Sequence, residues 1–123
     1  MNSESVILVV DDDEALREVI EWALVDEGFV VTVAENGAAA LRIVEHTAPS
    51  AILLDMRMPI MDGWEFARSY RELSVPHAPV IVLTAAQDAA EWARQIDAAD
   101  YLGKPFDMSE LLDTIKRHIG RLA

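Results

Sequence analysis

The chain alternates between short, continuous apolar runs and segments in which apolar residues recur at helical spacing. Runs rich in Val, Ile and Leu predict strands buried on both faces of a sheet. The predicted strands are 3–10, 29–34, 51–54, 79–83 and 101–102. Segments with a period near 3.6 residues predict helices, and they lie at 15–27, 38–45, 64–73, 88–96 and 107–119. Five strand-helix repeats predict a parallel sheet.

Parallel strands joined by helices require right-handed crossovers, which place helices on both faces of the sheet. The repeat therefore predicts a doubly wound α/β fold with five parallel strands, most simply in the flavodoxin-like order 2-1-3-4-5. No linker or low-complexity segment interrupts the chain, so residues 1–123 are expected to form one domain, with nothing left over for an effector domain. In this order the first and third strands are neighbours, and the ligand crevice lies beyond their carboxyl ends.

Composition and charge narrow the class of protein. A hydrophobic content of 52% in 123 residues is enough for one core, and the lack of cysteine fits a reducing, cytoplasmic setting. The longest wholly apolar run, Val6 to Val10, is far shorter than the roughly 20 residues of a membrane span. A net charge of -12, with the ten Lys and Arg residues scattered along the chain, argues against direct binding to nucleic acid.

Acidic residues follow two of the predicted strands. Asp11, Asp12 and Asp13 come after the first strand, and Asp55 comes after the third. Two carboxylates about 4 Å apart repel by roughly 4 kcal/mol at an effective dielectric constant near 20, so acids that converge must protonate, separate or bind a cation. Oxygen ligands with no nearby His or Cys favour a hard ion, and a small open site of this kind predicts Mg²⁺.

A hydroxyl and an ammonium group reach the same sheet edge. Thr84 follows the fourth predicted strand, and Lys104 follows the fifth. Carboxylates, a metal ion, a hydroxyl and an ammonium group together are typical of a phosphoryl site, in which an Asp serves as the nucleophile and the cations neutralise the transferring group. Asp55 is the predicted nucleophile.

The chain closely resembles the receiver domain of two-component response regulators over essentially its full length. Four segments carry this resemblance in order: VVDDDE at 9–14, LDMRMPIMDG at 54–63, LTA at 83–85 and DYLGKPF at 100–106. The resemblance implies that Asp11, Asp12 and Asp55 hold Mg²⁺ together with the backbone carbonyl of Arg57. It also implies that Asp55 is phosphorylated.

The resemblance implies a switch as well as an acceptor. Thr84 and Lys104 would bind the phosphoryl oxygens, and Tyr101 would turn inward when the threonine moves. The donor would be a phosphohistidine on a sensor histidine kinase or a histidine phosphotransfer protein. The output would be altered binding of a downstream protein or of a removed effector domain, or a phosphorylation-dependent dimer, through the fourth helix, fifth strand and fifth helix. The only chemistry expected is self-directed phosphoryl transfer and autodephosphorylation, so the chain is not expected to be an enzyme.

Three other functions are compatible with parts of this pattern. A dehalogenase-type phosphohydrolase also uses an aspartyl nucleophile with Mg²⁺, but it requires a second acid where Arg57 stands. A flavin- or nucleotide-binding module of the same fold requires a phosphate loop rich in Gly, Ser or Thr, whereas 11–13 are all acidic. A constitutive docking scaffold that never turns over phosphoryl groups is a further alternative.

Several residues invite a structural interpretation. Asp13 and Asp62 are expected to be cap and turn residues rather than ligands. Trp22 and Trp64 are expected to pack, while Trp92 could belong to an interface. Asp97 stands where the resembled family usually has glycine, and the short spacing between the fourth and fifth strands predicts an unusual fourth helix.

Overall fold

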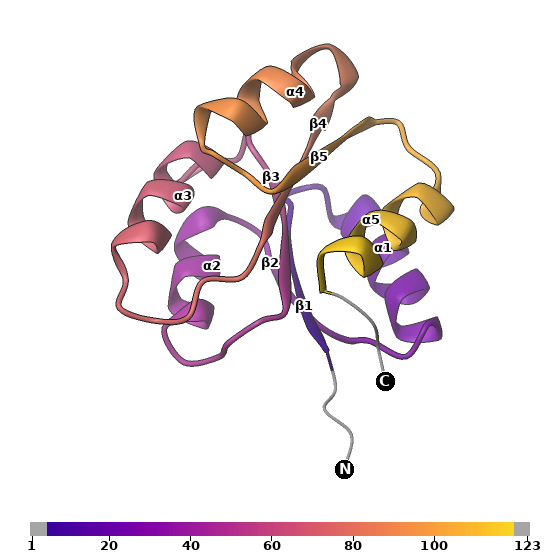
Figure 1. Ribbon diagram of the computed structural model, residues 1–123, viewed down its shortest axis with the longest axis horizontal. Coiled ribbons are helices and arrows are strands. Elements are labelled where there is room, and N and C mark those ends of the chain that lie inside the picture. Colours follow the sequence, from indigo (N-terminus) through magenta and orange to yellow (C-terminus); the bar gives the residue numbers. More distant parts are fainter. Residues whose placement is uncertain (1–4, 120–123) are drawn as a thin grey trace.

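The computed structural model describes residues 5–119 (Figure 1). Strands and helices alternate along the whole of this part of the chain. The strands are β1 (Val6–Val10), β2 (Val30–Ala34), β3 (Ala51–Asp55), β4 (Val80–Ala85) and β5 (Asp100–Lys104), and the helices are α1 (Glu14–Asp26), α2 (Gly37–Val44), α3 (Gly63–Glu72), α4 (Ala86–Gln95) and α5 (Met108–Ile119).

All strand pairings are parallel, and the strand order β2-β1-β3-β4-β5 confirms the prediction. The register pairs Val10 with Leu54, and Asp55 with Leu83, so the strand ends that carry the acids are level with one another. The order of connections reverses between β1 and β3, which is where an open α/β sheet binds its ligand.

The sheet separates two layers of helices. Figure 1 shows α1 and α5 on one side, and α2 and α3 on the other. Because successive strand side chains point to opposite faces, Leu8 and Val10 pack in the core under α2, α3 and α4, whereas Ile7 and Val9 pack under α1 and α5. Both faces of the central strands are therefore buried, as their continuous apolar runs predicted.

Side-chain caps fix where two site-bordering helices begin. Asp13 accepts a hydrogen bond from the Leu16 amide at the start of α1. Asp62 and Glu65 form a reciprocal capping box at the start of α3. Both Asp residues are therefore helix caps, as predicted, and each cap satisfies an amide that the first helical turn leaves unpaired.

Element boundaries and one packing prediction differ from the sequence expectations. The expected start of the first strand, at Ser3, lies outside the described residues. The helix α4 begins at Ala86, two residues before the expected start. The packing prediction for Trp22 is wrong, because this side chain is 82% exposed. It lies two residues from buried Ile20, which is half a turn away and places it on the opposite face of α1.

No helix within residues 5–119 is both long enough and apolar enough to cross a membrane.

Two helices end in the same hydrogen-bonded motif with different residues at its left-handed position. After α1, Gly28 has φ 97°, and the amide of Phe29 donates to the Leu24 carbonyl. After α4, Asp97 has φ 55°, and the amide of Ala98 donates to the Ala93 carbonyl. This is the Schellman arrangement, in which glycine is preferred because a side chain is unfavourable at positive φ.

Substitutions at these two positions are expected to have opposite effects. Gly28→Ala should lower the free energy of unfolding by about 1 kcal/mol, because no atom lies near the new methyl group and only the backbone strain remains. Asp97→Gly should raise it by up to about 1 kcal/mol. Urea denaturation of both variants beside the parent measures the two changes, and a less stable Asp97→Gly variant would contradict this assignment of strain.

Candidate functional site

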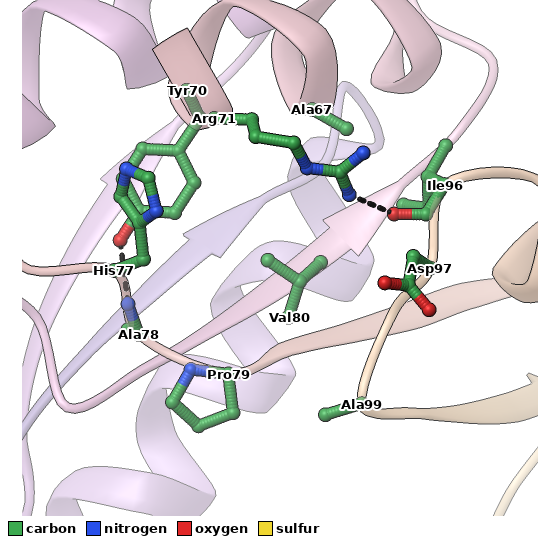
Figure 2. Close-up of a pocket in the computed structure, with 10 residues that line it drawn as sticks. All are labelled: Ala67, Tyr70, Arg71, His77, Ala78, Pro79, Val80, Ile96, Asp97 and Ala99. Atoms are coloured by element: carbon green, nitrogen blue, oxygen red, sulfur yellow. Dashed lines mark hydrogen bonds between the residues drawn. The ribbon is translucent and has the colours of Figure 1, made fainter. Parts of the chain in front are cut away.

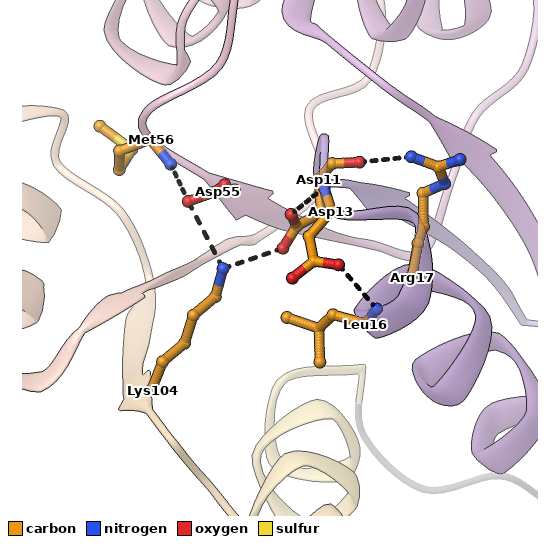
Figure 3. A network of polar contacts seen from close by, with 7 residues as sticks. All are labelled: Asp11, Asp13, Leu16, Arg17, Asp55, Met56 and Lys104. Carbon is orange, nitrogen blue, oxygen red and sulfur yellow. Dashed lines mark hydrogen bonds and ion pairs between the residues drawn. The ribbon is translucent and has the colours of Figure 1, made fainter.

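Four strands of the sheet deliver polar side chains to one edge, and Figure 3 shows the acids and the lysine that meet there. Asp11 directly follows β1, Asp55 ends β3, Thr84 lies near the end of β4 and Lys104 ends β5. In the register, Ala85 is opposite Lys104 and Thr84 is opposite Gly103, so the threonine and the lysine are diagonal neighbours. The predicted convergence at the carboxyl edge is therefore present.

The centre of the site is a lysine between two carboxylates. Lys104 Nζ lies 3.1 Å from Asp11 Oδ2 and 3.7 Å from Asp55 Oδ1. Oxygen atoms of Asp11, Asp12 and Asp55 all lie within 4.8 Å of one another. Asp11 is fully buried and Asp55 is 7% exposed, whereas Asp12 faces solvent. The Lys104 ammonium group thus contacts two of the three clustered carboxylates.

Backbone hydrogen bonds fix the direction of both buried acids. The Asp13 amide donates to Asp11 Oδ1 at 2.9 Å, and the Met56 amide donates to Asp55 Oδ1 at 2.9 Å. Arg17 Nη1 also donates to the Asp11 backbone carbonyl at 2.7 Å. These contacts orient the two carboxylates before any ligand binds.

The environment of Asp55 raises the pKa of its carboxyl group. Burial raises the pKa of this carboxyl from its ordinary value of 3.8 to about 7, and the Asp11 and Asp12 carboxylates act in the same direction. The Lys104 ammonium group and the Met56 amide lower the pKa but do not compensate for these effects. An additional cation would favour the ionised form.

The donor set of the site fits Mg²⁺. With all three carboxylates ionised, the one ammonium group leaves two uncompensated negative charges, which one divalent cation would neutralise. All three donors are oxygens, and the exposed Asp12 leaves the site open to water. Mg²⁺ favours one or two carboxylates, retained waters and a phosphate oxygen over a closed protein cage.

The loop between β3 and α3 is held close to the acid site by two glycines. A Cβ atom on Gly63 would lie 2.9 Å from the Asp55 carbonyl oxygen and 2.6 Å from Met56 Sδ. A Cβ atom on Gly37 would lie 2.7 Å from the Met61 carbonyl oxygen. No local sequence pattern indicates the Gly37 contact, because it is made with a loop 24 residues later.

The same loop contains a strained residue. Ile60 has φ 73°, an unfavourable value for a β-branched side chain, and its neighbours close a tight turn through a hydrogen bond from the Met61 amide to the Pro59 carbonyl at 2.8 Å. The Ile60 side chain is 81% exposed. Strain of this kind persists only where the surrounding contacts determine the backbone, and the close approaches of the two glycines provide such contacts.

The remaining predicted residues lie around this centre. Thr84 is 5% exposed, and Tyr101 is 46% exposed on the edge strand β5, opposite Val82. The Arg57 side chain is exposed, and its guanidinium carbon lies 5.0 Å from the centre of the Trp92 ring. No sequence pattern indicated this contact, because it joins a loop to a helix 35 positions away. The peptide bond between Lys104 and Pro105 is cis.

A cavity of about 270 Å³ lies at the opposite, amino edge of β4 (Figure 2). Two of its polar side chains already have partners: Arg71 Nη2 donates to the Ile96 carbonyl at 2.5 Å, and the Tyr70 hydroxyl accepts from the Ala78 amide at 2.7 Å. No group of converging acids lines it. The chemistry of the described residues is therefore concentrated at the carboxyl edge.

The fold and site define a class: a flavodoxin-like α/β protein with an acidic crevice and a lysine at the switch point of its sheet. The response regulator receiver domain family matches residues 7–116. The chain belongs to this family and is thus a receiver domain of the two-component type, as its motifs predicted.

Relatives and solved structures agree with this membership. The chain is 41% identical over 116 residues to the DNA-binding transcriptional regulator NtrC of Escherichia coli K12, covering 93% of this chain and 24% of the relative. It is 40% identical over 117 residues to the response regulator MprA of Mycobacterium leprae, covering 94% and 51%. The chain thus spans between a quarter and a half of the length of these relatives.

Two solved structures share the whole fold. The receiver domain of the sensor histidine kinase PA1611 from Pseudomonas aeruginosa PAO1, solved with magnesium in its active site cleft, has a TM-score of 0.88 and 36% identity, covering 97% of this chain and 100% of that one. The chemotaxis protein CheY4 of Vibrio cholerae has a TM-score of 0.84 and 29% identity, covering 94% and 99%.

The raised pKa of Asp55 predicts that the parent protein and Asp55→Asn differ in stability by an amount that depends on pH. The folded protein keeps this proton up to about pH 7, whereas the unfolded chain releases it near pH 3.8. The free energy of unfolding should therefore fall as the pH rises from about 3.8 to about 7. Above pH 7, Asp55 is ionised in both states and its contribution should no longer change with pH. Without divalent ions, Asp55→Asn should be more stable than the parent by about 1–3 kcal/mol at pH 8, and this advantage should shrink towards pH 4.

Urea denaturation in the presence of a chelator at pH 4.5 and pH 8 measures this difference. Asp13→Asn is the matched control, because it replaces a neighbouring exposed acid and keeps a good helix cap. An Asp55→Asn advantage that is the same at both pH values would contradict the role of Asp55 ionisation.

Proposed function

We propose that this receiver domain is a phosphorylation-dependent signalling switch that accepts a phosphoryl group on Asp55 in the presence of Mg²⁺. The observation that carries the proposal is the position of Lys104 Nζ between Asp11 and Asp55, beside three carboxylates that suit a divalent ion. Residues 1–123 are proposed to form one such domain, either free-standing or as part of a longer regulator.

In the proposed reaction the Asp55 carboxylate attacks the phosphorus of a phosphohistidine. The new bond joins a carboxylate oxygen to phosphorus, the bond between phosphorus and the imidazole nitrogen breaks, and the imidazole leaves with the electron pair. The Met56 amide holds Asp55 Oδ1, which fixes the carboxylate plane for attack. Lys104 and Thr84 are proposed to bind the phosphoryl oxygens and so to neutralise charge on the transferring group.

The proposed ligands of the metal are carboxylate oxygens of Asp11, Asp12 and Asp55, with the backbone carbonyl of Arg57. When bound, Mg²⁺ would supply positive charge next to both the acceptor and a phosphoryl oxygen. Magnesium in the cleft of the PA1611 receiver domain supports this choice of ion. The positive charge of a bound divalent ion would also lower the pKa of Asp55 and so favour its ionised, nucleophilic form.

The proposed output surface comprises α4, β5 and α5. A phosphoryl group adds negative charge and strong hydrogen-bond acceptors, which would draw the Thr84 hydroxyl towards Asp55 and leave room for the Tyr101 ring to turn inward. The Tyr101 side chain is half exposed in this structure, which leaves it free to change orientation. The same transition would alter the binding of a downstream protein, an effector domain or a second copy.

A groove next to the site suits an incoming phosphodonor. Its volume is about 420 Å³, and its apolar lining includes Leu16, Pro105, Phe106 and Met108, with Lys104 at its edge. A sensor histidine kinase or a histidine phosphotransfer protein could place an apolar surface here while its phosphohistidine reaches Asp55. The proposed reaction is self-directed, and Arg57 occupies the position at which a phosphohydrolase of the dehalogenase type requires a second acid.

Incubation with Mg²⁺ and a small acyl phosphate should add one phosphoryl group per chain, detected by intact mass. Asp55→Asn should abolish the adduct, because it removes the nucleophile, and a chelator should greatly reduce it. Asp13→Asn should still form the adduct, since Asp13 is a helix cap rather than a ligand. An adduct that persists in Asp55→Asn would refute the assignment.

Arg57→Ala should alter the rate at which the phosphorylated protein loses its adduct. The side chain stands two residues beyond the acceptor, where it affects the approach of water to the phosphoryl group. The measurement is a time course of intact mass after removal of the donor, with Arg68→Ala, a change at an exposed arginine of α3, as the control. Equal rates for the parent and Arg57→Ala would exclude this role.

A further inference from the structure

The Arg57 guanidinium group does not join the acid cluster beside it. Within residues 5–119 it makes no ion pair or hydrogen bond, and the cation that contacts Asp11 and Asp55 is Lys104. Its guanidinium carbon lies instead over the face of Trp92 in α4, at 5.0 Å from the ring centre. A cation is thus turned away from a site that is short of positive charge.

Simple electrostatics would favour a pair between the Arg57 guanidinium group and a nearby carboxylate. Two residues of extended chain span at most about 7 Å, and an arginine side chain is about as long, so Arg57 is within reach of the carboxylates near Asp55. Guanidinium and carboxylate groups form bidentate pairs of high geometric specificity. An arginine paired in this way would occupy the oxygens that a metal ion needs.

Contacts from two helices hold the Trp92 ring in place. The Trp64 ring of α3 meets it edge to face, with centres 4.9 Å apart and planes at 64°. Trp64 Nε1 donates a hydrogen bond to Gln95 Oε1 at 2.8 Å, which joins the first turn of α3 to the last turn of α4. Trp92 also packs against the buried core. The aromatic face beneath Arg57 is therefore a fixed part of the structure.

We propose that Trp92 is a positioning residue for the metal site: it holds the Arg57 guanidinium group on α4 and thereby keeps the acidic crevice open to Mg²⁺. This inference rests on the metal site of the proposed function. It also couples that site to α4, because any movement of α4 that takes Trp92 from Arg57 frees a competitor for the carboxylates. By linkage, metal binding then favours the position of α4 that retains the contact.

Mg²⁺ binding without any phosphodonor tests the proposal, measured by isothermal titration calorimetry. A cation-π contact at a partly exposed site contributes about 0.5–1 kcal/mol, which corresponds to a change of about two- to five-fold in an equilibrium constant. Trp92→Ala should therefore raise the Kd for Mg²⁺ by about two- to five-fold. Trp92→Phe keeps an aromatic face and should recover part of the loss.

The decisive comparison is the same tryptophan change in an Arg57→Ala background. If Trp92 acts through the guanidinium group, the factor by which Trp92→Ala raises the Kd should fall to about one once that group is gone. Alanine retains the backbone carbonyl at position 57, so the proposed ligand is still present. Trp22→Ala, at the exposed tryptophan of α1, is the matched control and should bind Mg²⁺ as the parent does.

The outcomes separate this inference from the proposed function. Equal weakening by Trp92→Ala in both backgrounds, or no weakening in the presence of Arg57, would overturn the positioning role even if the acyl phosphate reaction proceeds. If Trp92→Ala weakens Mg²⁺ binding only in the presence of Arg57, but the protein forms no phosphoryl adduct, the positioning role is supported and the acceptor role is refuted. Failure of the parent protein to bind Mg²⁺ would overturn both. Circular dichroism melts identify any variant that is unfolded, and Trp92→Phe then provides the comparison.

Discussion

Repulsion among the carboxylates at the ends of β1 and β3 is the constraint on which the rest of the site depends. Folding places Asp11 and Asp55 side by side in a buried crevice, and one lysine from β5 only partly offsets their charge. Burial and the neighbouring carboxylates therefore raise the pKa of Asp55 to about 7. This repulsion is the basis of the proposed metal site and of the proposed switch.

The surrounding structure maintains this unfavourable arrangement. Apolar side chains bury both faces of the central strands, so the sheet cannot move the acids apart without exposing its core. Close contacts at Gly37 and Gly63 hold the loop after Asp55, and backbone amides orient the acids themselves. The stability of the apolar layers thus supports a charged site that is locally costly, which is the usual relation between a scaffold and a functional site.

Features set by local pattern were predictable from the sequence. Continuous apolar runs indicated the strands, the strand order followed from topology, and acids at strand ends implied their own convergence with Lys104. Contacts between distant segments were not predictable in the same way. The stacking of Arg57 on Trp92 depends on how a loop and a helix from different repeats meet. The exposure of Trp22 could have been inferred, because Ile20 and Leu24 define the buried face of α1 and Trp22 lies opposite to it.

We infer that these carboxylates form one divalent cation site beside Lys104. The most direct test of this inference is a crystal structure of the protein soaked in Mn²⁺, with the ion located by anomalous scattering. We expect one strong peak between Asp11, Asp12 and Asp55, with their oxygens bound to the ion directly or through water. No peak in the crevice at saturating Mn²⁺, or a peak bound only elsewhere on the molecule, would contradict it.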